Sequence, residues 1–107
     1  MMDMSNRLLN ATQILQDVLG PKFSYTRTQI LLLVKNEPNI DFLKLAHAAG
    51  VSKACLSREL AVLSDREDQQ PPGLGLLHIF ETPGETHRKV RLTDKGLNLI
   101  NQIFTHT

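Results

Sequence analysis

Residues 45–63 constrain the fold of this chain more than any other stretch. They read Leu-Ala-His-Ala-Ala-Gly-Val-Ser, followed by Lys-Ala-Cys-Leu-Ser-Arg-Glu-Leu-Ala-Val-Leu. The pattern predicts a short helix, a turn at Gly50 and a second helix capped by Ser52. Glycine adopts the left-handed conformation of such a turn at little cost, and serine caps free helix amides. Two helices joined in this way form a helix-turn-helix, whose second helix typically enters the DNA major groove.

Size and composition favour one small intracellular domain. The chain has 107 residues, of which 41% are hydrophobic, and we expect a single domain over residues 1–107. No apolar run approaches the ~20 residues that a membrane span needs, and no basic and apolar blocks of a secretory signal begin the sequence. The one cysteine, Cys55, cannot form an internal disulfide. These features predict a cytoplasmic protein without a membrane partner.

Charge is unevenly distributed along the sequence. The net charge is only +1, which by itself does not indicate a nucleic-acid partner. An ordinary solvated surface would also show charge clusters, so their meaning depends on the fold. The basic cluster is Arg88, Lys89, Arg91 and Lys95, and the acidic cluster is Asp65, Glu67 and Asp68.

Four predicted helix starts share the hydrophobic staple, in which apolar residues flank a polar cap. Each has an apolar residue directly before the cap and another four positions after it. At the first of these starts Gln29 also completes a capping box with Thr26. The sets of preceding residue, cap and following residue are Tyr25, Thr26, Ile30; Ile40, Asp41, Leu45; Val51, Ser52, Leu56; and Leu92, Thr93, Leu97.

The remaining pattern completes a mainly α fold with a small β-hairpin. Apolar spacing predicts helices over 5–19, 26–36, 41–48, 52–64 and about 94–104. Short β-rich runs at 76–81 and 87–92 flank a turn and predict a hairpin. A hairpin placed directly after the second helix of a helix-turn-helix is a wing, here at about 75–92. The predicted architecture is therefore a winged helix-turn-helix.

The second helix and the wing carry the candidate DNA contacts. If Leu56 and Leu60 are buried, the polar N-terminal half of that helix faces outward, and this half normally reaches base edges. Arg58 suits a bidentate contact with guanine, worth roughly 1–3 kcal/mol of discrimination. The wing adds side chains for phosphates or the minor groove. The predicted DNA-binding residues are Ser52, Lys53, Ala54, Ser57 and Arg58 on the helix and His87, Arg88, Lys89 and Arg91 on the wing.

Two positions leave alternatives open. Glu59 occupies a place where many such motifs have an apolar residue, so it either points at DNA and accepts from cytosine or repels phosphate. On the wing, strand alternation places Lys89 and Arg91 outward if Val90 faces the core. Lys89 is then a better phosphate contact by geometry than Arg88, which shares the inner side unless it lies beyond the packed region.

The residues give weaker support for redox, metal or catalytic chemistry than for DNA binding. Cys55 is the third residue of the second helix, where a helix N-terminus favours the thiolate. It is either a redox switch that disturbs DNA contact on oxidation or a small, partly buried filler. The sequence shows no metal-ligand spacing among its histidines, no Gly-rich phosphate loop and no nucleophile–base pair, so we expect no metal, no cofactor and no enzyme activity. The histidines are His47, His78, His87 and His106.

Several motifs together resemble a known family. They are Tyr25-Thr26-x-x-Gln29-Ile30, Leu45-Ala46, Gly50-Val51-Ser52 with Leu56-Ser57-Arg58, Leu76-Leu77, and the run from Val90 to Gly96. With them, residues 25–98 resemble the MarR family of bacterial winged-helix transcription regulators. The resemblance implies a dimer on a pseudo-palindromic operator, with the second helix in the major groove and the wing at the adjacent minor groove.

The resemblance also implies that the terminal helices, 1–20 and 94–107, form the dimer around a DNA-binding core at 25–92. Their apolar residues exceed what two peripheral helices of a monomer require, although an intramolecular core is the other interpretation. One alternative function is a winged-helix module that binds a protein and no DNA, and a second is a thiol-responsive repressor that uses Cys55. A small-molecule effector is left open. The predicted dimer residues are Leu8, Leu15, Val18, Ile100, Ile103 and Phe104.

Overall fold

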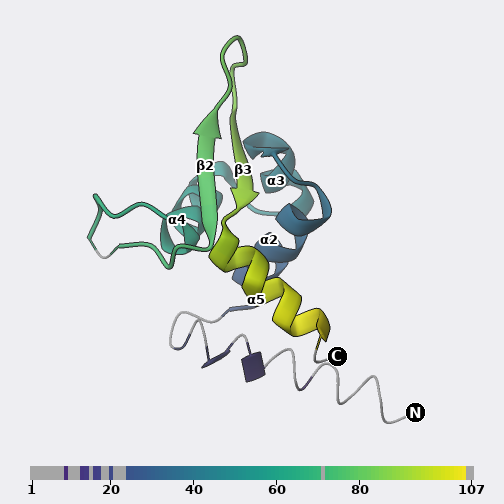
Figure 1. Ribbon diagram of the computed structural model, residues 1–107. Coiled ribbons are helices and arrows are strands. Elements are labelled where there is room, and N and C mark those ends of the chain that lie inside the picture. Colours follow the sequence, from purple (N-terminus) through teal and green to yellow (C-terminus); the bar gives the residue numbers. More distant parts are fainter. Residues whose placement is uncertain are drawn as a thin grey trace.

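The computed structural model describes residues 9, 13, 14, 16, 17, 20, 24–70 and 72–105, with the side chains of 103–105 left out. Most of the helix predicted at 5–19 therefore lies outside the described residues. Figure 1 shows the elements in chain order. They are α2 (Tyr25–Asn36), β1 (Ile40–Asp41), α3 (Phe42–Ala49), α4 (Lys53–Leu63), β2 (Leu77–Glu81), β3 (Arg88–Leu92) and α5 (Asp94–Thr105).

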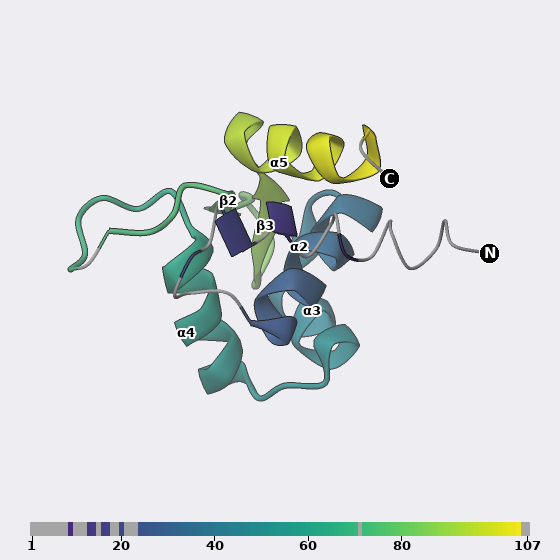
Figure 2. The ribbon, with the colours of Figure 1, turned by 90° about the horizontal axis from the view of Figure 1, so that it is seen from below.

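The core lies where three helices, the sheet and α5 meet. Figure 2 shows α5 along one side of the molecule and α4 away from it, with the strands seen nearly end-on between them. Side chains from every one of these elements contribute to a single apolar cluster. Burial of this surface is the main force that holds α4 in place. The most buried apolar residues, each at most 1% exposed, are Ile30, Leu31, Val34, Leu45, Leu56, Leu60, Leu63, Leu76, Leu77, Val90 and Ile100.

The start of α2 differs from the prediction. Ser24 caps the helix, and its hydroxyl oxygen accepts from the Arg27 amide at 3.2 Å. Thr26, the predicted cap, lies inside the helix, and Tyr25 is its first residue with 79% of its surface exposed. Serine is as good a cap as threonine. Because Ser24 lies two positions before Thr26, the helix begins at Tyr25 and not at the predicted boundary. The helix ends at Asn36, before the predicted Glu37-Pro38 stop.

The helix-turn-helix is confirmed. Asp41 caps α3 and accepts from the amides of Leu43 and Lys44. Gly50 ends α3 in the left-handed conformation at φ 69°, and its amide donates back to the carbonyl of His47 at 3.1 Å. Ser52 then caps α4 by accepting from the Cys55 amide at 3.1 Å. Local cap and turn chemistry therefore determines the bounds of both helices.

The sheet has one strand more than the predicted hairpin. β2 and β3 pair antiparallel, with His78 opposite Arg91 and Ile79 opposite Val90. The two-residue strand β1 pairs with the other edge of β3, so the order is β1-β3-β2. In Figure 1 the hairpin rises clear of the helices. Val90 is fully buried, as expected for the inner side of the hairpin.

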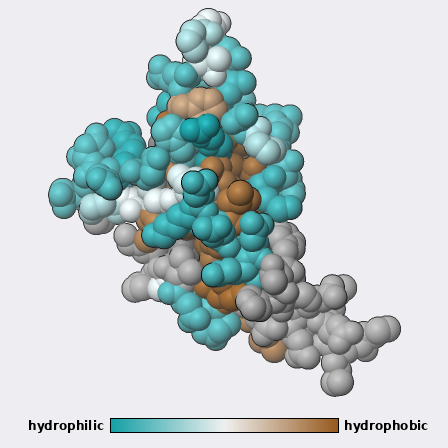
Figure 3. Space-filling view, in the orientation of Figure 1, coloured by the Kyte–Doolittle hydropathy of each residue, from teal (hydrophilic) through white to brown (hydrophobic). Residues whose placement is uncertain are grey.

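The connection between α4 and β2, residues 64–70 and 72–76, projects sideways as the acidic arm (Figure 1). Its outer part is hydrophilic in the space-filling view (Figure 3). Its base is tightly packed, because a Cβ added to Gly73 would lie 2.0 Å from the Ser64 carbonyl oxygen. Two of its acids have partners: Asp65 Oδ2 lies 2.9 Å from His78 Nδ1, and hydrogen bonding from the Arg66 guanidinium lowers the pKa of Asp68.

Residues 74–76 of this arm contact the end of α4 on one side and the start of α5 on the other. The amides of Leu74 and Leu76 donate to the carbonyls of Val62 and Leu63, both at 2.8 Å. On the other side, the Thr93 amide donates to the Leu76 carbonyl at 3.0 Å. A Cβ on Gly96 would lie 2.1 Å from that same carbonyl oxygen, so α5 begins against the arm backbone.

The predicted cap at Thr93 is confirmed, since its Oγ1 accepts from the Gly96 amide at 3.0 Å. The same hydroxyl donates to the Gly75 carbonyl at 2.6 Å. Among the described residues, no helix is both long enough and apolar enough to cross a membrane.

Candidate nucleic-acid interface

One face of α4 presents the residues predicted to contact DNA. Lys53, Ala54, Ser57 and Arg58 are all exposed, while Leu56, Leu60 and Leu63 of the opposite face are at most 1% exposed. This separation follows the helical period, because residues three and four apart share a face. Ser52 lies at the same end, and its hydroxyl oxygen is engaged as the cap. The structure therefore brings the five predicted helix residues together at the start of α4.

Cys55 lies between these two faces. It is partly buried, it forms no disulfide, and its amide is held by the Ser52 cap. The thiol is consequently not part of the fully exposed face. Within the described part of the chain, no group of three or more His, Cys, Asp or Glu side chains is arranged to hold a metal ion.

Glu59 of α4 is directed toward α2. Arg27 Nε of α2 donates to Glu59 Oε2 at 2.5 Å, and the two side chains are 20% and 19% exposed. Glu59 is engaged with Arg27 in this geometry, and its two sequence interpretations, as a cytosine acceptor and as a phosphate-repelling charge, stay predictions. Sequence reasoning missed Arg27, because two residues 32 positions apart become neighbours only through the packing of α2 against α4.

The wing cations are engaged within the protein to different degrees. Lys89 Nζ lies 3.0 Å from Glu85 Oε2, and the Lys89 side chain is 26% exposed. The preference for Lys89 over Arg88 is therefore not supported by the geometry, since Lys89 already has an anionic partner. Arg88 is exposed, and its guanidinium lies 4.9 Å from the Phe42 ring centroid, a cation–π contact that connects the wing to α3.

The predicted wing residues do not form one patch. Arg88 pairs with Glu81 near the distal end of the hairpin, whereas Arg91 pairs with His78 nearer its base. Three residue-to-residue steps along the extended strand place them about 10 Å apart. The Arg91 guanidinium lies 5.4 Å from the Phe80 ring, on the strand face opposite to Val90. His87 is exposed beside Arg88, so the distal pair His87 and Arg88 is separate from Arg91.

The predicted dimer residues are only partly described. Leu8, Leu15 and Val18, together with the side chains of Ile103 and Phe104, lie outside the described residues. Ile100 is described and is 1% exposed within this single chain. Because it packs in the core of its own chain, its side chain has almost no surface to offer a second copy. Leu97, one turn earlier on α5, is 44% exposed.

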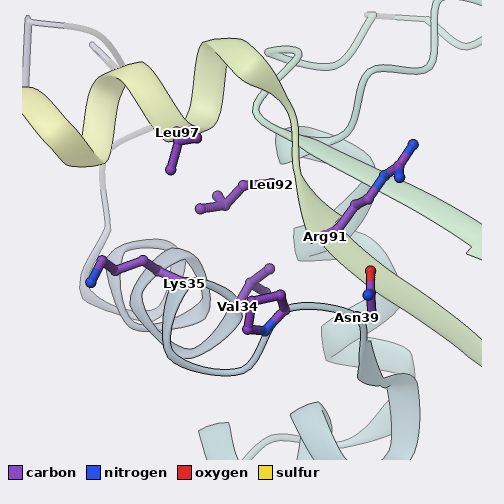
Figure 4. Close-up of a pocket in the computed structure, with 7 residues that line it drawn as sticks. Val34, Lys35, Asn39, Arg91, Leu92 and Leu97 are labelled. Atoms are coloured by element: carbon purple, nitrogen blue, oxygen red, sulfur yellow. The ribbon is translucent and has the colours of Figure 1, made fainter.

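A recess of about 250 Å³ opens between α2, β3 and α5. Figure 4 shows Val34, Leu92 and Leu97 converging on it, with Lys35 and Arg91 directed away at its two ends. Pro38 and Asn39, the latter at φ 63°, complete the lining. Sequence reasoning identified no such recess, because its walls come from three elements distant in the chain.

Comparison with solved structures identifies the architecture. RV1404 from Mycobacterium tuberculosis matches with a TM-score of 0.70 at 18% identity, covering 98% of this chain and 67% of that one. MarR matches at 0.66 and 22%, covering 96% and 71%. The transcriptional repressor CouR, bound to a 23-mer DNA duplex, matches at 0.66 and 18%, covering 97% and 69%.

These identities are low, and no family model and no curated protein matches the chain by sequence. The agreement is therefore one of fold, and it extends over almost the whole chain. It includes the helix-turn-helix, the hairpin behind it and the helix that follows. The expectation drawn from the sequence motifs is confirmed at this level: the chain has the winged-helix fold of the MarR-type transcriptional regulators.

Proposed function

We propose that this protein is a sequence-specific double-stranded DNA-binding transcriptional regulator. The observation that carries the proposal is the exposed face at the start of α4, where Lys53, Ser57 and Arg58 lie on one side of a helix whose other side is fully packed. A helix held in this way presents its side chains in a defined geometry, and base readout depends on such geometry. The neighbour CouR, which shares the fold, is itself bound to DNA.

Within this proposal, α4 reads the major groove. Arg58 makes the bidentate contact with guanine, and Lys53 and Ser57 contact bases or phosphates. Ala54 is suited to the methyl group of thymine, which apolar side chains recognise. Ser52 positions the backbone through its cap and offers its hydroxyl hydrogen to a phosphate.

The wing makes the second contact. His87 and Arg88 at its distal end approach the minor groove or the backbone, and Lys89 joins them when a phosphate replaces Glu85 as its partner. Arg91 nearer the base contacts the backbone at most. These contacts fix position on the duplex, while α4 supplies most of the sequence discrimination.

We further propose that the protein acts as a cytoplasmic homodimeric repressor on a pseudo-palindromic site and that it has no enzymatic activity. Support comes from the fold shared with CouR, which is a repressor, and from the limited contact that a single winged helix makes with DNA. In such a dimer the two α4 helices lie roughly 34–36 Å apart. The dimer contacts come from the helices at both ends of the chain.

Selection of bound duplexes from a random pool tests the proposal, followed by titration of the recovered duplex at several salt concentrations. Binding should weaken steeply as salt rises, and Arg58→Ala should reduce affinity by roughly 5- to 150-fold, as expected for a bidentate pair worth 1–3 kcal/mol. Arg66→Ala, an exposed arginine on the acidic arm, is the matched control and should bind like the parent.

Equal losses in the two arginine variants would show that α4 is not the reading surface. Absence of salt-dependent binding to every duplex would exclude DNA binding altogether. That second result would instead favour a winged-helix module that binds a protein, with the acidic arm as the surface to examine first.

A further inference from the structure

The contact between Arg27 and Glu59 is unlike the other ion pairs of the described residues. Both of its side chains are about four-fifths buried, whereas at least one partner in each other pair is 40% exposed or more. It also joins two helices that are far apart in sequence. Removal of the arginine from such a pair is costly, because the Glu59 carboxylate then stays largely buried without this partner.

Each end of this pair is held on a well-fixed element. Arg27 lies in the first turn of α2, where its amide donates to the Ser24 cap, and Ile30 and Leu31 follow it into the core. Glu59 lies on α4 directly between Arg58, which is exposed, and Leu60, which is buried. The pair therefore lies at the edge of the apolar core to which both helices contribute.

The apolar packing of α4 holds the helix against the core, and the Arg27–Glu59 contact adds a directional restraint at a second point of the helix. Contacts of Leu56, Leu60 and Leu63 depend on buried area and shape, because the hydrophobic effect itself is not directional. A charge-assisted hydrogen bond at 2.5 Å is directional and short. A rotation of α4 about its axis would move Glu59 away from Arg27 and Arg58 away from its base in the same motion.

We propose that Arg27 and Glu59 are a positioning pair that sets the rotation of α4 and thereby the discrimination between specific and non-specific DNA. The inference rests on the proposed function and deepens it. Neither residue touches DNA. Their effect is on the ratio of affinities for the specific duplex and a random duplex, because bidentate base contacts need a precise geometry and phosphate contacts tolerate more variation.

Charge reversal tests the pair in the full chain. The variants are Arg27→Glu, Glu59→Arg and the two combined, each titrated with the duplex recovered by selection and with a random duplex of equal length. Each single variant should lower the affinity ratio by roughly tenfold, within the coupling energies typical of contacting residues. The double variant, which restores an opposite-charge pair, should recover most of the ratio.

The ratio of the affinities for the specific and the random duplex separates an effect on the position of α4 from an effect of net charge. A change in net charge alters the affinity for both duplexes alike, so it cancels in the ratio. Glu67→Arg on the acidic arm makes the same two-unit change of charge as Glu59→Arg and is its control. Thermal unfolding of each variant establishes the temperature below which all are folded. The double variant keeps the measurement informative if a single variant unfolds, because its net charge and its pairing match those of the parent.

Single variants that bind more weakly or more tightly with an unchanged ratio would overturn the inference, as would a folded double variant that stays unselective. A parent protein that binds neither duplex in a salt-dependent manner would instead refute the proposed function, and the inference with it. The two failures are therefore distinguishable in the same titrations.

Discussion

The start of α4 and the wing make up the two halves of the proposed interface. The two halves differ in whether their basic side chains already have partners within the protein. Lys53 and Arg58 of α4 are exposed, and no ion pair of either is found in the part of the chain that the structure describes. On the wing, Lys89 is paired with Glu85, and Arg88 lies over the Phe42 ring. In the proposed complex, DNA would therefore meet free cations on α4, whereas on the wing it would first have to replace contacts within the protein.

The difference implies that equal numbers of contacts in the two halves contribute unequally to binding. A phosphate that displaces Glu85 gains only the difference between two ion pairs, and exposed pairs are worth little to begin with. A base that meets Arg58 displaces only water and gains a bidentate pair in a desolvated groove. We expect affinity and specificity to come mainly from α4, with the wing adding orientation.

The largest effect should follow from removal of the packing beneath α4. Leu60 is 1% exposed, and Leu60→Ala leaves a cavity that should lower the free energy of unfolding by about 2–5 kcal/mol. Specific DNA binding should fall with it, even where the protein remains folded, because α4 loses its support. Urea denaturation measures the first effect and titration the second. A folded Leu60→Ala protein with parental specificity would show that α4 does not depend on its packed face.

A comparison of two conservative substitutions should give the next largest effect. Arg58→Lys keeps the charge but removes the fork that contacts two guanine acceptors, so discrimination should fall by roughly 1–3 kcal/mol at one base position. Arg88→Lys on the wing should change affinity slightly and equally for all sequences. Titration against single-base variants of the selected duplex measures both. A position-specific loss in Arg88→Lys would move base readout to the wing.

The smallest effect on DNA affinity should come from a variant that frees Lys89 from its ion pair with Glu85. Glu85→Gln removes the acid that pairs with Lys89 and one negative charge from the wing, so affinity for any duplex should rise by about 1.5- to 5-fold, the range of exposed ion pairs. The plot of log affinity against log salt should steepen by up to about one unit if Lys89 then binds a phosphate. Unchanged affinity and slope would mean that Lys89 lies beyond reach of the duplex.

Local chemistry made the helix-turn-helix predictable. Asp41, Gly50 and Ser52 each determine their boundary through a cap or a left-handed turn within a few residues, and all three act as expected. The same reasoning failed at the start of α2, where Ser24 is the cap and Thr26 is not. Two adequate cap residues, Ser24 and Thr26, lie close together, and the local pattern alone does not select between them.

Contacts between elements were beyond prediction from one sequence. Glu59 was interpreted by its own helix alone, yet its role depends on Arg27 in another helix. β1 was missed because two residues that pair with β3 also precede a helix, and their pairing depends on where the hairpin folds back. Exposure of the α4 face was predictable because it follows from helical period alone.

The segment Leu74 to Leu76 connects the end of α4 to the start of α5. Its backbone is bonded to the last turn of α4 on one side and to Thr93 at the start of α5 on the other, with Gly96 in direct contact. A shift of the start of α5 must therefore break several backbone hydrogen bonds or carry the end of α4 with it. The helix proposed to read DNA and the helix on the opposite side of the molecule are thus joined through one hydrogen-bonded backbone segment.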